Sequence, residues 1–545
     1  MKIEILDGVM FKKALLGAAN FLDKNKEEVN SLNVFPVPDG DTGTNMSLTV
    51  NSAIKHGLNL EDDNVSKIAS ATSYGSLMGA RGNSGVILSQ LFRGFANGLV
   101  EKDEVDTKAL ANALKQAADT AYKAVMKPTE GTILTVAREI GDFALSICRE
   151  EKDIITFLKK IIDYGNIVLN KTPDMLPVLK QAGVVDAGGK GLMYIITGAY
   201  NALAGIEDVH VEVEDSKVGF ERTVHEAPLD TEDIKFGYCT EFIINSKHGD
   251  IDIFREEISI HGDSLLVVGG EGLIKVHIHT NNPGLVLEKA LKLGELTDIK
   301  IDNMRYQHEE ILLKSSAEVK DIVSEESKQY SFVVVSVGEG IDKVFEGLNV
   351  DKLVSGGQTM NPSTEDILKA VSETTGENVF ILPNNSNIIL AAEQAKELSD
   401  KNVAVIPTKT IPQGISALFA FDEMQSLEEN VESMIEAIQD VKTGQVTYSV
   451  RDTEYNNTKI NKDDIIGIAE GEIVANGKDI NLVSLELLEN MIDEDTSLVT
   501  IFYGSDIEED MAKDLESQLS DKYGDVDIEL IYGGQPIYYY IFSIE

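Results

Sequence analysis

The stretch NVFPVPDGDTGTN, residues 33–45, carries Asp39 and Asp41 on either side of a glycine, directly before a predicted helix. Two prolines stiffen the chain that leads to this loop. Mg²⁺ in proteins takes carboxylates together with substrate phosphates. A helix start also offers N–H groups and a positive dipole end to phosphate oxygens. The stretch therefore favours an Mg²⁺–phosphate site, with a plain turn and helix cap as the alternative.

Three further glycine-containing loops precede predicted helices: GARGNSG at residues 79–85, PTEGT at 128–132 and VVDAGGKG at 184–191. With the first stretch, they come before the second, fourth, sixth and eighth helices of the N-terminal region. Short connections make consecutive helices antiparallel, so alternate helices of an up-and-down bundle start at the same end. We therefore expect all four loops to meet at one rim. The helical period of the apolar residues places the eight helices at about 8–27, 43–57, 63–78, 84–99, 106–125, 132–150, 153–169 and 188–203.

The composition limits the class of protein. The chain has 545 residues, which suggests about three domains at roughly 100–200 residues each. Lys and Arg number 48 against 92 Asp and Glu, and the net charge of −44 disfavours nucleic acid and anionic lipid as partners. Cys148 and Cys239 lie far apart, which fits a reducing compartment without a disulfide framework. No apolar run reaches the roughly 20 residues of a membrane span, and the N-terminus is not that of a signal peptide. We therefore expect a cytoplasmic protein without stable membrane insertion.

The apolar pattern divides the chain into three domains. An all-α domain over 1–205 contains the eight helices, in an up-and-down arrangement. After a charged linker, 206–232, an α+β middle domain over 233–310 has the β-α-β-β-α-β order of the ferredoxin-like fold. A second linker, 311–330, leads to an α/β domain over 331–545, whose short β-branched runs suit a parallel sheet.

A cysteine and two histidines form a second candidate site in the middle domain. His277 and His279 are one residue apart on a predicted strand, so their side chains are expected on one face. In the ferredoxin-like order, the strand that begins near Cys239 is the antiparallel neighbour of this strand. Such a set suits zinc with an open position, and Glu241 is the candidate fourth ligand. The alternatives are a phosphoryl-carrying histidine and a half-buried cysteine beside hydrogen-bonded histidines.

The four N-terminal stretches resemble the nucleotide-binding L-subunit domain of dihydroxyacetone kinase, in the version carried by the ATP-binding subunit of bacterial fatty acid kinase. The resemblance implies an eight-helix barrel that holds ATP and Mg²⁺ at one rim, with Asp39 and Asp41 as metal ligands. Val34 stands where the family pattern has a third aspartate, and the adjacent Asn33 is the candidate third ligand. In the resembling protein the cysteine and histidines are also important. The candidate catalytic residues are then Asp39, Asp41, Cys239, His277 and His279.

The loops around the expected rim supply the candidate ATP-binding residues. Matches to the family pattern place Thr44, Asn45, Ser84 and Gly85 near the phosphates. Arg81 either offsets phosphate charge or is a solvated residue at a helix start. The full set of candidates is Thr42, Thr44, Asn45, Arg81, Asn83, Ser84, Gly85, Thr129, Thr132 and Asp186.

The C-terminal domain resembles DegV-like fatty-acid-binding proteins in two stretches, VSGGQTMNPSTEDI and the final GGQPIYYYIFSIE. Asn384, Asn385 and Ser386 follow a predicted strand, where ligand loops lie in α/β sheets. The domain either binds a ligand or only docks a partner.

Together these features predict a kinase subunit that binds ATP and Mg²⁺ and phosphorylates a fatty acid, forming an acyl phosphate. The fatty acid would be presented by a separate DegV-like fatty-acid-binding protein. The alternatives are a dihydroxyacetone-type small-molecule kinase and a nucleotide- or metal-sensing scaffold without turnover. An exposed sheet in the middle domain would suit a homodimer.

Overall fold

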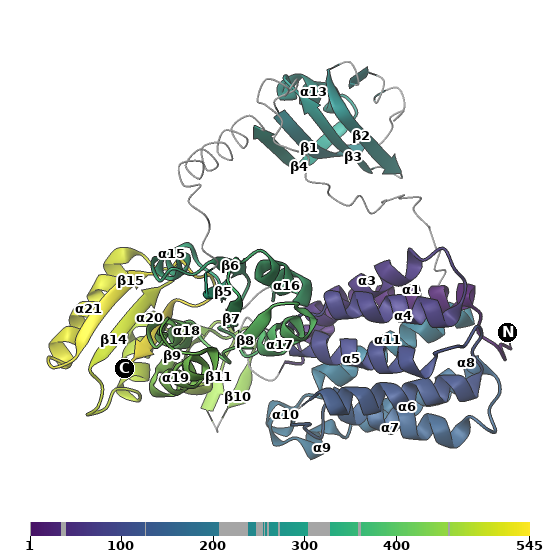
Figure 1. Cartoon of the computed structure of the whole chain (residues 1–545), viewed down its shortest axis with the longest axis horizontal. Coiled ribbons are helices and arrows are strands. Elements are labelled where there is room, and N and C mark those ends of the chain that lie inside the picture. Colours follow the sequence, from purple (N-terminus) through teal and green to yellow (C-terminus); the bar gives the residue numbers. More distant parts are fainter. Residues whose placement is uncertain are drawn as a thin grey trace. The chain divides into compact units, whose positions relative to one another are not determined.

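The chain is divided into two compact units, one formed by Met1–Glu214 with Ser327–Glu545 and the other by Asp215–Glu326 (Figure 1). The helical N-terminal region and the C-terminal α/β region thus belong to one unit, an association that the sequence did not predict. No helix among the described residues is long and apolar enough to cross a membrane. The computed structural model describes residues 2–33, 40–125, 127–206, 238–246, 254, 257–258, 261–270, 273–303, 328–357, 361–455 and 458–545.

The helical region is built from long helices joined by short connections (Figure 1). Each packs against the next in chain order, and the last, α11, packs against both α8 and α1. All of them lie within one turn of the predicted positions. They are α1 (Gly8–Lys24), α3 (Thr42–Leu58), α4 (Val65–Met78), α5 (Gly82–Gly98), α6 (Thr107–Ala124), α7 (Ile133–Ile147), α8 (Ile154–Leu169) and α11 (Ala187–Ala204). The short helices α2 (Lys26–Asn30), α9 (Thr172–Met175) and α10 (Pro177–Ala182) were not predicted, because so few residues show no clear period.

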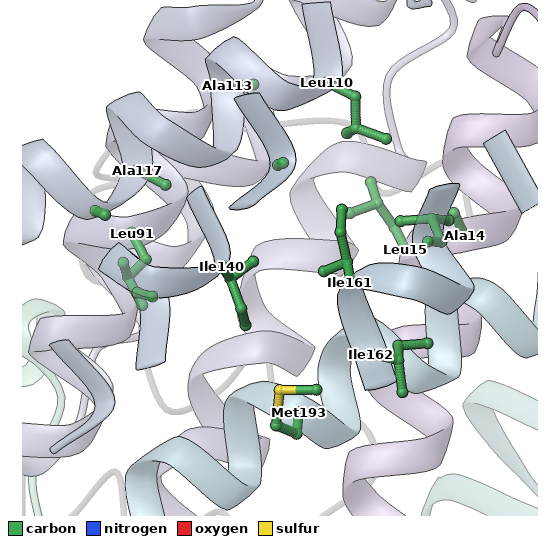
Figure 2. Packing of buried hydrophobic residues seen from close by; sticks show 14 of the residues in the cluster. Ala14, Leu15, Leu91, Leu110, Ala113, Ala117, Ile140, Ile161, Ile162 and Met193 are labelled. Atoms are coloured by element: carbon green, nitrogen blue, oxygen red, sulfur yellow. The ribbon is translucent and has the colours of Figure 1, made fainter. Parts of the chain in front are cut away.

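Apolar side chains from these helices meet in a shared core (Figure 2). Leu15 of α1 and Leu110 of α6 are buried there, as their spacing predicts. Burying such a side chain stabilises the fold by about 1.5–3 kcal/mol. Because all the long helices share this core, their starts are held in fixed relative positions. The core also takes buried side chains from α5, α7, α8 and α11, among them Leu91, Ile140, Ile161 and Met193.

Helices α1 and α11 approach each other closely because glycines face each other where they cross. A Cβ atom added to Gly17 would stand 2.5 Å from the Cβ of Ala202 and 2.6 Å from the backbone oxygen of Gly198. A Cβ atom added to Gly198 would stand 2.3 Å from the backbone oxygen of Gly17. The two backbones are therefore in contact, and this contact brings the last helix back to the first.

The C-terminal region contains a parallel sheet with the strand order β6-β5-β7-β8. Its strands are those that the β-branched runs predict, so this expectation is confirmed. They are β5 (Tyr330–Ser336), β6 (Lys352–Ser355), β7 (Asn378–Leu382) and β8 (Asn402–Val405). The helices in this part of the chain are α15 (Glu339–Gly347), α16 (Thr364–Ser372), α17 (Ile389–Leu398), α18 (Ile411–Phe419) and α19 (Leu427–Asp440).

A second sheet completes this region, with the order β13-β12-β9-β16-β14-β15. Only β14 and β15 pair in parallel within it. Its strands are β9 (Lys442–Tyr448), β12 (Ile465–Ala469), β13 (Glu472–Gly477), β14 (Leu498–Tyr503), β15 (Asp527–Tyr532) and β16 (Tyr540–Ile544). The remaining elements are α20 (Ile480–Glu489), α21 (Glu509–Lys522) and a hairpin of β10 (Thr453–Tyr455) with β11 (Thr458–Ile460).

The second unit holds an antiparallel sheet with the order β2-β3-β1-β4. Buried side chains of the sheet and of α13 form its core, among them Phe242, Val276, Ile278 and Val286. The first helix of the predicted β-α-β-β-α-β order, between β1 and β2, lies largely outside the described residues. The described elements are β1 (Tyr238–Ser246), β2 (Gly262–Gly270), β3 (Leu273–Thr280), α13 (Pro283–Ala290) and β4 (Gly294–Asn303).

We predict that Gly17→Ala destabilises the protein, although alanine is favoured over glycine inside a helix by about 1 kcal/mol. The added methyl group would press against the Gly198 oxygen, and overpacking of this kind costs about 1–3 kcal/mol. The change in the free energy of unfolding is measured by urea titration, with circular dichroism as the signal. Gly347 in α15 has open space at its Cβ position. Gly347→Ala is therefore the control, and it should be neutral or stabilising. A Gly17→Ala protein at least as stable as the wild type would contradict the close contact.

Candidate functional site

The starts of α3, α5, α7 and α11 surround one cavity of about 710 Å³. Binding sites for small molecules have volumes of roughly 300–1,000 Å³, so a ligand the size of a nucleotide fits. The structure thus brings the four glycine-containing helix starts together. From the helical region, the polar and glycine residues that line the cavity are Asn33, Gly40, Asp41, Thr42, Asn45, Asn83, Ser84, Thr132, Asp186 and Gly188.

The first turn of α3 is capped by a residue that the sequence did not single out. The side-chain oxygen of Asn30 accepts hydrogen bonds from the backbone N–H groups of Gly43 (2.8 Å) and Thr44 (3.1 Å). Asp41 occupies the N-cap position but makes no side-chain capping bond. These two amides are therefore used by Asn30, and the Asp41 carboxylate has another role. It accepts a hydrogen bond from the side-chain amide of Asn361.

The start of α5 depends on a glycine in the left-handed region. Gly82 has a φ of 58°, and a Cβ atom there would stand 2.6 Å from the side-chain nitrogen of the buried Asn45. Arg81, the N-cap residue, makes no capping hydrogen bond. Its guanidinium donates instead to the backbone oxygen of Asn361 (2.7 Å) and pairs with Asp366 at 3.4 Å. Arg81 therefore lines a neighbouring cavity of about 490 Å³, while the N–H groups of α5 face no side-chain cap.

The starts of α7 and α11 differ in how they are capped. Thr132 at the start of α7 makes no capping bond with its side chain. Asp186 at the start of α11 accepts a hydrogen bond from the Gly189 amide at 2.6 Å. Burial raises the pKa of Asp186 to about 6, against the opposing effect of hydrogen bonds from the Gly189 and Ile133 amides. A negative charge at Asp186 is thus held at neutral pH at a cost to stability.

The charges around the cavity are mostly negative. Asp41, Asp186 and Glu470 contribute carboxylates, and Lys409 is the basic side chain among the lining residues that the structure describes. Such a lining repels a polyphosphate by itself. It is suited to a ligand that arrives with divalent cations, which hard carboxylate oxygens bind.

The C-terminal region supplies the rest of the lining. Asn384 has a φ of 53°, and its side chain donates to the backbone oxygen of Val335 at 3.0 Å, which fixes the loop after β7. Asn385 and Ser386 of the predicted ligand loop line the same cavity. Sequence reasoning missed five further residues of the lining, because they lie in stretches without a recognisable motif: Lys409, Thr410, Gln413, Thr443 and Glu470.

The predicted site residues thus fall into separate groups. Eight of them line the cavity: Asn33, Asp41, Thr42, Asn45, Asn83, Ser84, Thr132 and Asp186. Thr44, Arg81, Gly85 and Thr129 are not among its lining residues. Thr44 is bonded to Asn30, and Gly85 packs against Thr49. Asp39 lies outside the described residues.

The cluster of Cys239, His277 and His279 is described by its backbone register alone. Cys239 lies opposite His279, and Glu241 opposite His277, in the pairing of β1 with β3. Asp263 of β2 is the other neighbour of His279. Within the part of the chain whose side chains are described, no group of three or more His, Cys, Asp or Glu residues could hold a metal ion.

Comparisons with known proteins match the whole length of the chain. Family models match residues 36–201 (DAK2 domain), 235–311 (FakA-like middle domain of fatty acid kinase) and 331–545 (FakA-like C-terminal domain of fatty acid kinase). The protein YloV of Bacillus subtilis strain 168 is 45% identical over 553 residues, which cover all of both chains. An uncharacterized protein of Staphylococcus aureus strain USA300 is 43% identical over 552 residues, again with full coverage. The chain belongs to the FakA-like family of fatty acid kinase subunits.

Two solved structures are similar to part of the chain. A DegV family protein from Corynebacterium glutamicum is 15% identical, with a TM-score of 0.32, over 40% of this chain and 96% of its own. The Streptococcus pneumoniae fatty acid kinase B3 protein, loaded with linoleic acid, is 12% identical, with a TM-score of 0.28, over 40% of this chain and 99% of its own.

We predict that Asp186→Asn stabilises the protein at pH 7.5 by about 2 kcal/mol, after allowance for the partial exposure of this side chain. The pKa of Asp186 is raised to about 6 in the folded chain, so the folded state binds the proton more tightly than the unfolded state does. Its ionisation therefore costs stability as the pH rises from about 4 to about 6. Asparagine removes the charge and keeps one side-chain oxygen, which can still cap the helix through the Gly189 amide. Urea unfolding should show a larger free energy of unfolding for Asp186→Asn than for the wild type at pH 7.5. This difference should become smaller toward pH 4.5.

Asp153, the N-cap of α8, is the control of opposite sign. Burial pushes its pKa up, but hydrogen bonds from Thr156 and the Ile3 amide outweigh burial and lower the pKa overall. Asp153→Asn should therefore lose stability at pH 7.5. If the two substitutions changed the free energy of unfolding at pH 7.5 by the same amount, the charge of Asp186 would not be destabilising.

Proposed function

We propose that this chain is the ATP-binding subunit of a fatty acid kinase, and that the cavity between the helical and C-terminal regions is its Mg·ATP site. The observation that supports this most is the meeting of four helix starts around one acidic cavity in a member of this family. In this proposal the long helices form an eight-helix barrel, and the second unit has the ferredoxin-like arrangement.

Different residues bind the phosphates and the metal ion. The N–H groups at the start of α5, where no side chain caps the helix, donate to phosphate oxygens. The start of α7 lies beside them, although its first amide, that of Ile133, already donates to Asp186. Asp39 and Asp41 hold Mg²⁺, with Asn33 as a third ligand. The donor set fits such an ion, because carboxylate and amide oxygens are hard ligands. Bound Mg²⁺ would offset the negative charge of the phosphates and of the cavity wall.

The acceptor is the carboxylate of a fatty acid on a separate, DegV-like binding protein. A carboxylate oxygen attacks the γ-phosphorus of ATP, a P–O bond to the acyl group forms, and the bond to the β-phosphate breaks with ADP as the leaving group. Catalysis of this kind rests on positioning and on charge neutralisation. The chain's own contribution is to hold the triphosphate at the rim and to exclude water with the C-terminal region.

We predict that Asp41→Asn lowers phosphoryl transfer about 100-fold or more, the scale expected when a charge-stabilising group is lost. The helix start should be unaffected, because Asn30 and not Asp41 caps α3. The measurement is transfer of ³²P from ATP to a fatty acid loaded on its purified binding protein, with the acyl phosphate identified by mass spectrometry. Asp119→Asn, which removes an exposed carboxylate from α6, is the control and should retain activity.

The same assay separates the three candidate functions. Transfer to the fatty acid supports the proposal. Transfer to dihydroxyacetone alone would indicate a small-molecule kinase. ATP binding without transfer to any acceptor would indicate a sensing scaffold. Full activity of Asp41→Asn would show that Asp41 is not a ligand of the catalytic metal ion.

Cys239, His277 and His279 are proposed to bind zinc in the second unit. The support is the register that sets Cys239 opposite His279 on neighbouring strands. We predict about one zinc ion per chain in the purified protein, a typical content for a Cys/His site. Mass-spectrometric metal analysis should show loss of zinc in Cys239→Ser and its retention in Cys148→Ser, which alters a buried cysteine directly after α7. Acid-labile ³²P on a zinc-free chain would support a phosphoryl-carrying histidine instead.

A further inference from the structure

The C-terminal region reaches the Asp41 carboxylate through Asn361. The side-chain nitrogen of Asn361 donates a hydrogen bond to Asp41 Oδ2, although the two residues lie 320 positions apart in the chain. Asn361 is 1% exposed, so the donor of this bond is buried, while Asp41 is half-buried at the cavity. A hydrogen bond to an ionised carboxylate is roughly twice as strong as one between neutral groups. The contact therefore restricts how the Asp41 carboxylate can turn.

Asn361 itself is fixed by the start of α5. Arg81 donates from its guanidinium to the backbone oxygen of Asn361 at 2.7 Å. The backbones of Arg81 and Ser363 form an isolated antiparallel bridge, and the Thr364 amide donates to the Ala80 oxygen at 3.1 Å. The segment after Asn361 thus pairs through its backbone with the residues directly before α5. These hydrogen bonds fix the position of Asn361.

The side-chain oxygen of Asn361 is buried and makes no hydrogen bond. An unsatisfied buried group of this kind costs about 1–3 kcal/mol. The other orientation of the amide would place this oxygen against the Asp41 carboxylate, where two acceptors would repel each other. An apolar residue of the same size would avoid the cost. Packing alone therefore does not explain an asparagine here, whereas the bond to Asp41 does.

The geometry points to Asn361 as a positioning residue that orients the Asp41 carboxylate for Mg·ATP. This inference rests on the proposed function. One oxygen of Asp41 is held by Asn361, which leaves the carboxylate in a defined orientation toward a cation. Hydrogen bonds that support a metal ligand in this way raise metal affinity about 10–100-fold. The C-terminal region therefore completes the metal site, at the contact surface between that region and α5.

Arg451 provides a second contact between the C-terminal region and the loop that precedes α3. Arg451, also from the C-terminal region, donates from its guanidinium to the backbone oxygens of Ser31 (2.6 Å) and Asn33. Asn33 is the candidate third ligand and lines the cavity with Asp41. The C-terminal region thus holds the chain at both Asn33 and Asp41.

The test is the Mg²⁺ dependence of nucleotide binding by the full-length chain. A fluorescent ATP analogue is titrated at increasing Mg²⁺ in the wild type, Asn361→Ala and Asn361→Leu, the last of which retains the volume if the smaller variant does not fold. The Mg²⁺ concentration for half-maximal binding should rise about 10–100-fold in either variant. At saturating Mg²⁺, the amount of analogue bound should reach the wild-type level in both variants.

Gln394 provides the matched control, because it bonds to Gln90 at 2.9 Å in the same contact surface without touching Asp41. Gln394→Ala should leave the Mg²⁺ dependence unchanged. In the Asp41→Asn background, Asn361→Ala should cause no further loss, since it acts through Asp41. An unchanged Mg²⁺ dependence in Asn361→Ala, or an equal loss in Gln394→Ala, would overturn the inference. If Asp41→Asn itself leaves the Mg²⁺ dependence unchanged, the proposed metal site fails instead.

Discussion

A polyanion can bind in a cavity lined by carboxylates only when positive charge is supplied with it. This constraint governs the seam between the helical and C-terminal regions, where Asp41, Asp186 and Glu470 surround the cavity and Lys409 is the basic residue among the described lining. The positive ends of the α5 and α7 dipoles, and the uncapped N–H groups of α5, provide part of that charge. Divalent cations held by aspartates provide the rest in our account. The overall charge of −44 makes this local compensation necessary.

The cavity is arranged at some cost to stability. Asp186 keeps a carboxylate in surroundings that raise its pKa, and Asn361 retains a buried oxygen without a partner. Both of these costs lie at or beside the proposed site, whereas the core of the helices is formed by apolar side chains. Functional sites are where such costs are expected, because the rest of the fold can support them. The cap from Asn30 is one such support, since it relieves Asp41 of a structural role.

Much of this arrangement could be predicted from the sequence. The helical period located the long helices, the β-branched runs located the parallel sheet, and the order of the glycine loops predicted their meeting at one rim. The sequence did not predict that Arg81 turns toward Asn361 and Asp366 instead of the cavity. Nor did it predict that the C-terminal region closes the site. Contacts such as that of Arg451 with Asn33 join residues 418 positions apart, and no local pattern encodes them. Asp39, which the motif places beside Asp41, lies outside the described residues.

The central claim is that Asp41 and the helix starts together bind a metal-bound nucleoside triphosphate. The most direct measurement is a crystal structure of the full-length chain with a non-hydrolysable ATP analogue and Mn²⁺, located by anomalous scattering. Our account predicts a manganese peak about 2.1 Å from an oxygen of Asp41, with the phosphates against the starts of α5 and α7. A nucleotide bound elsewhere on the chain, or a manganese ion remote from Asp41, would contradict it.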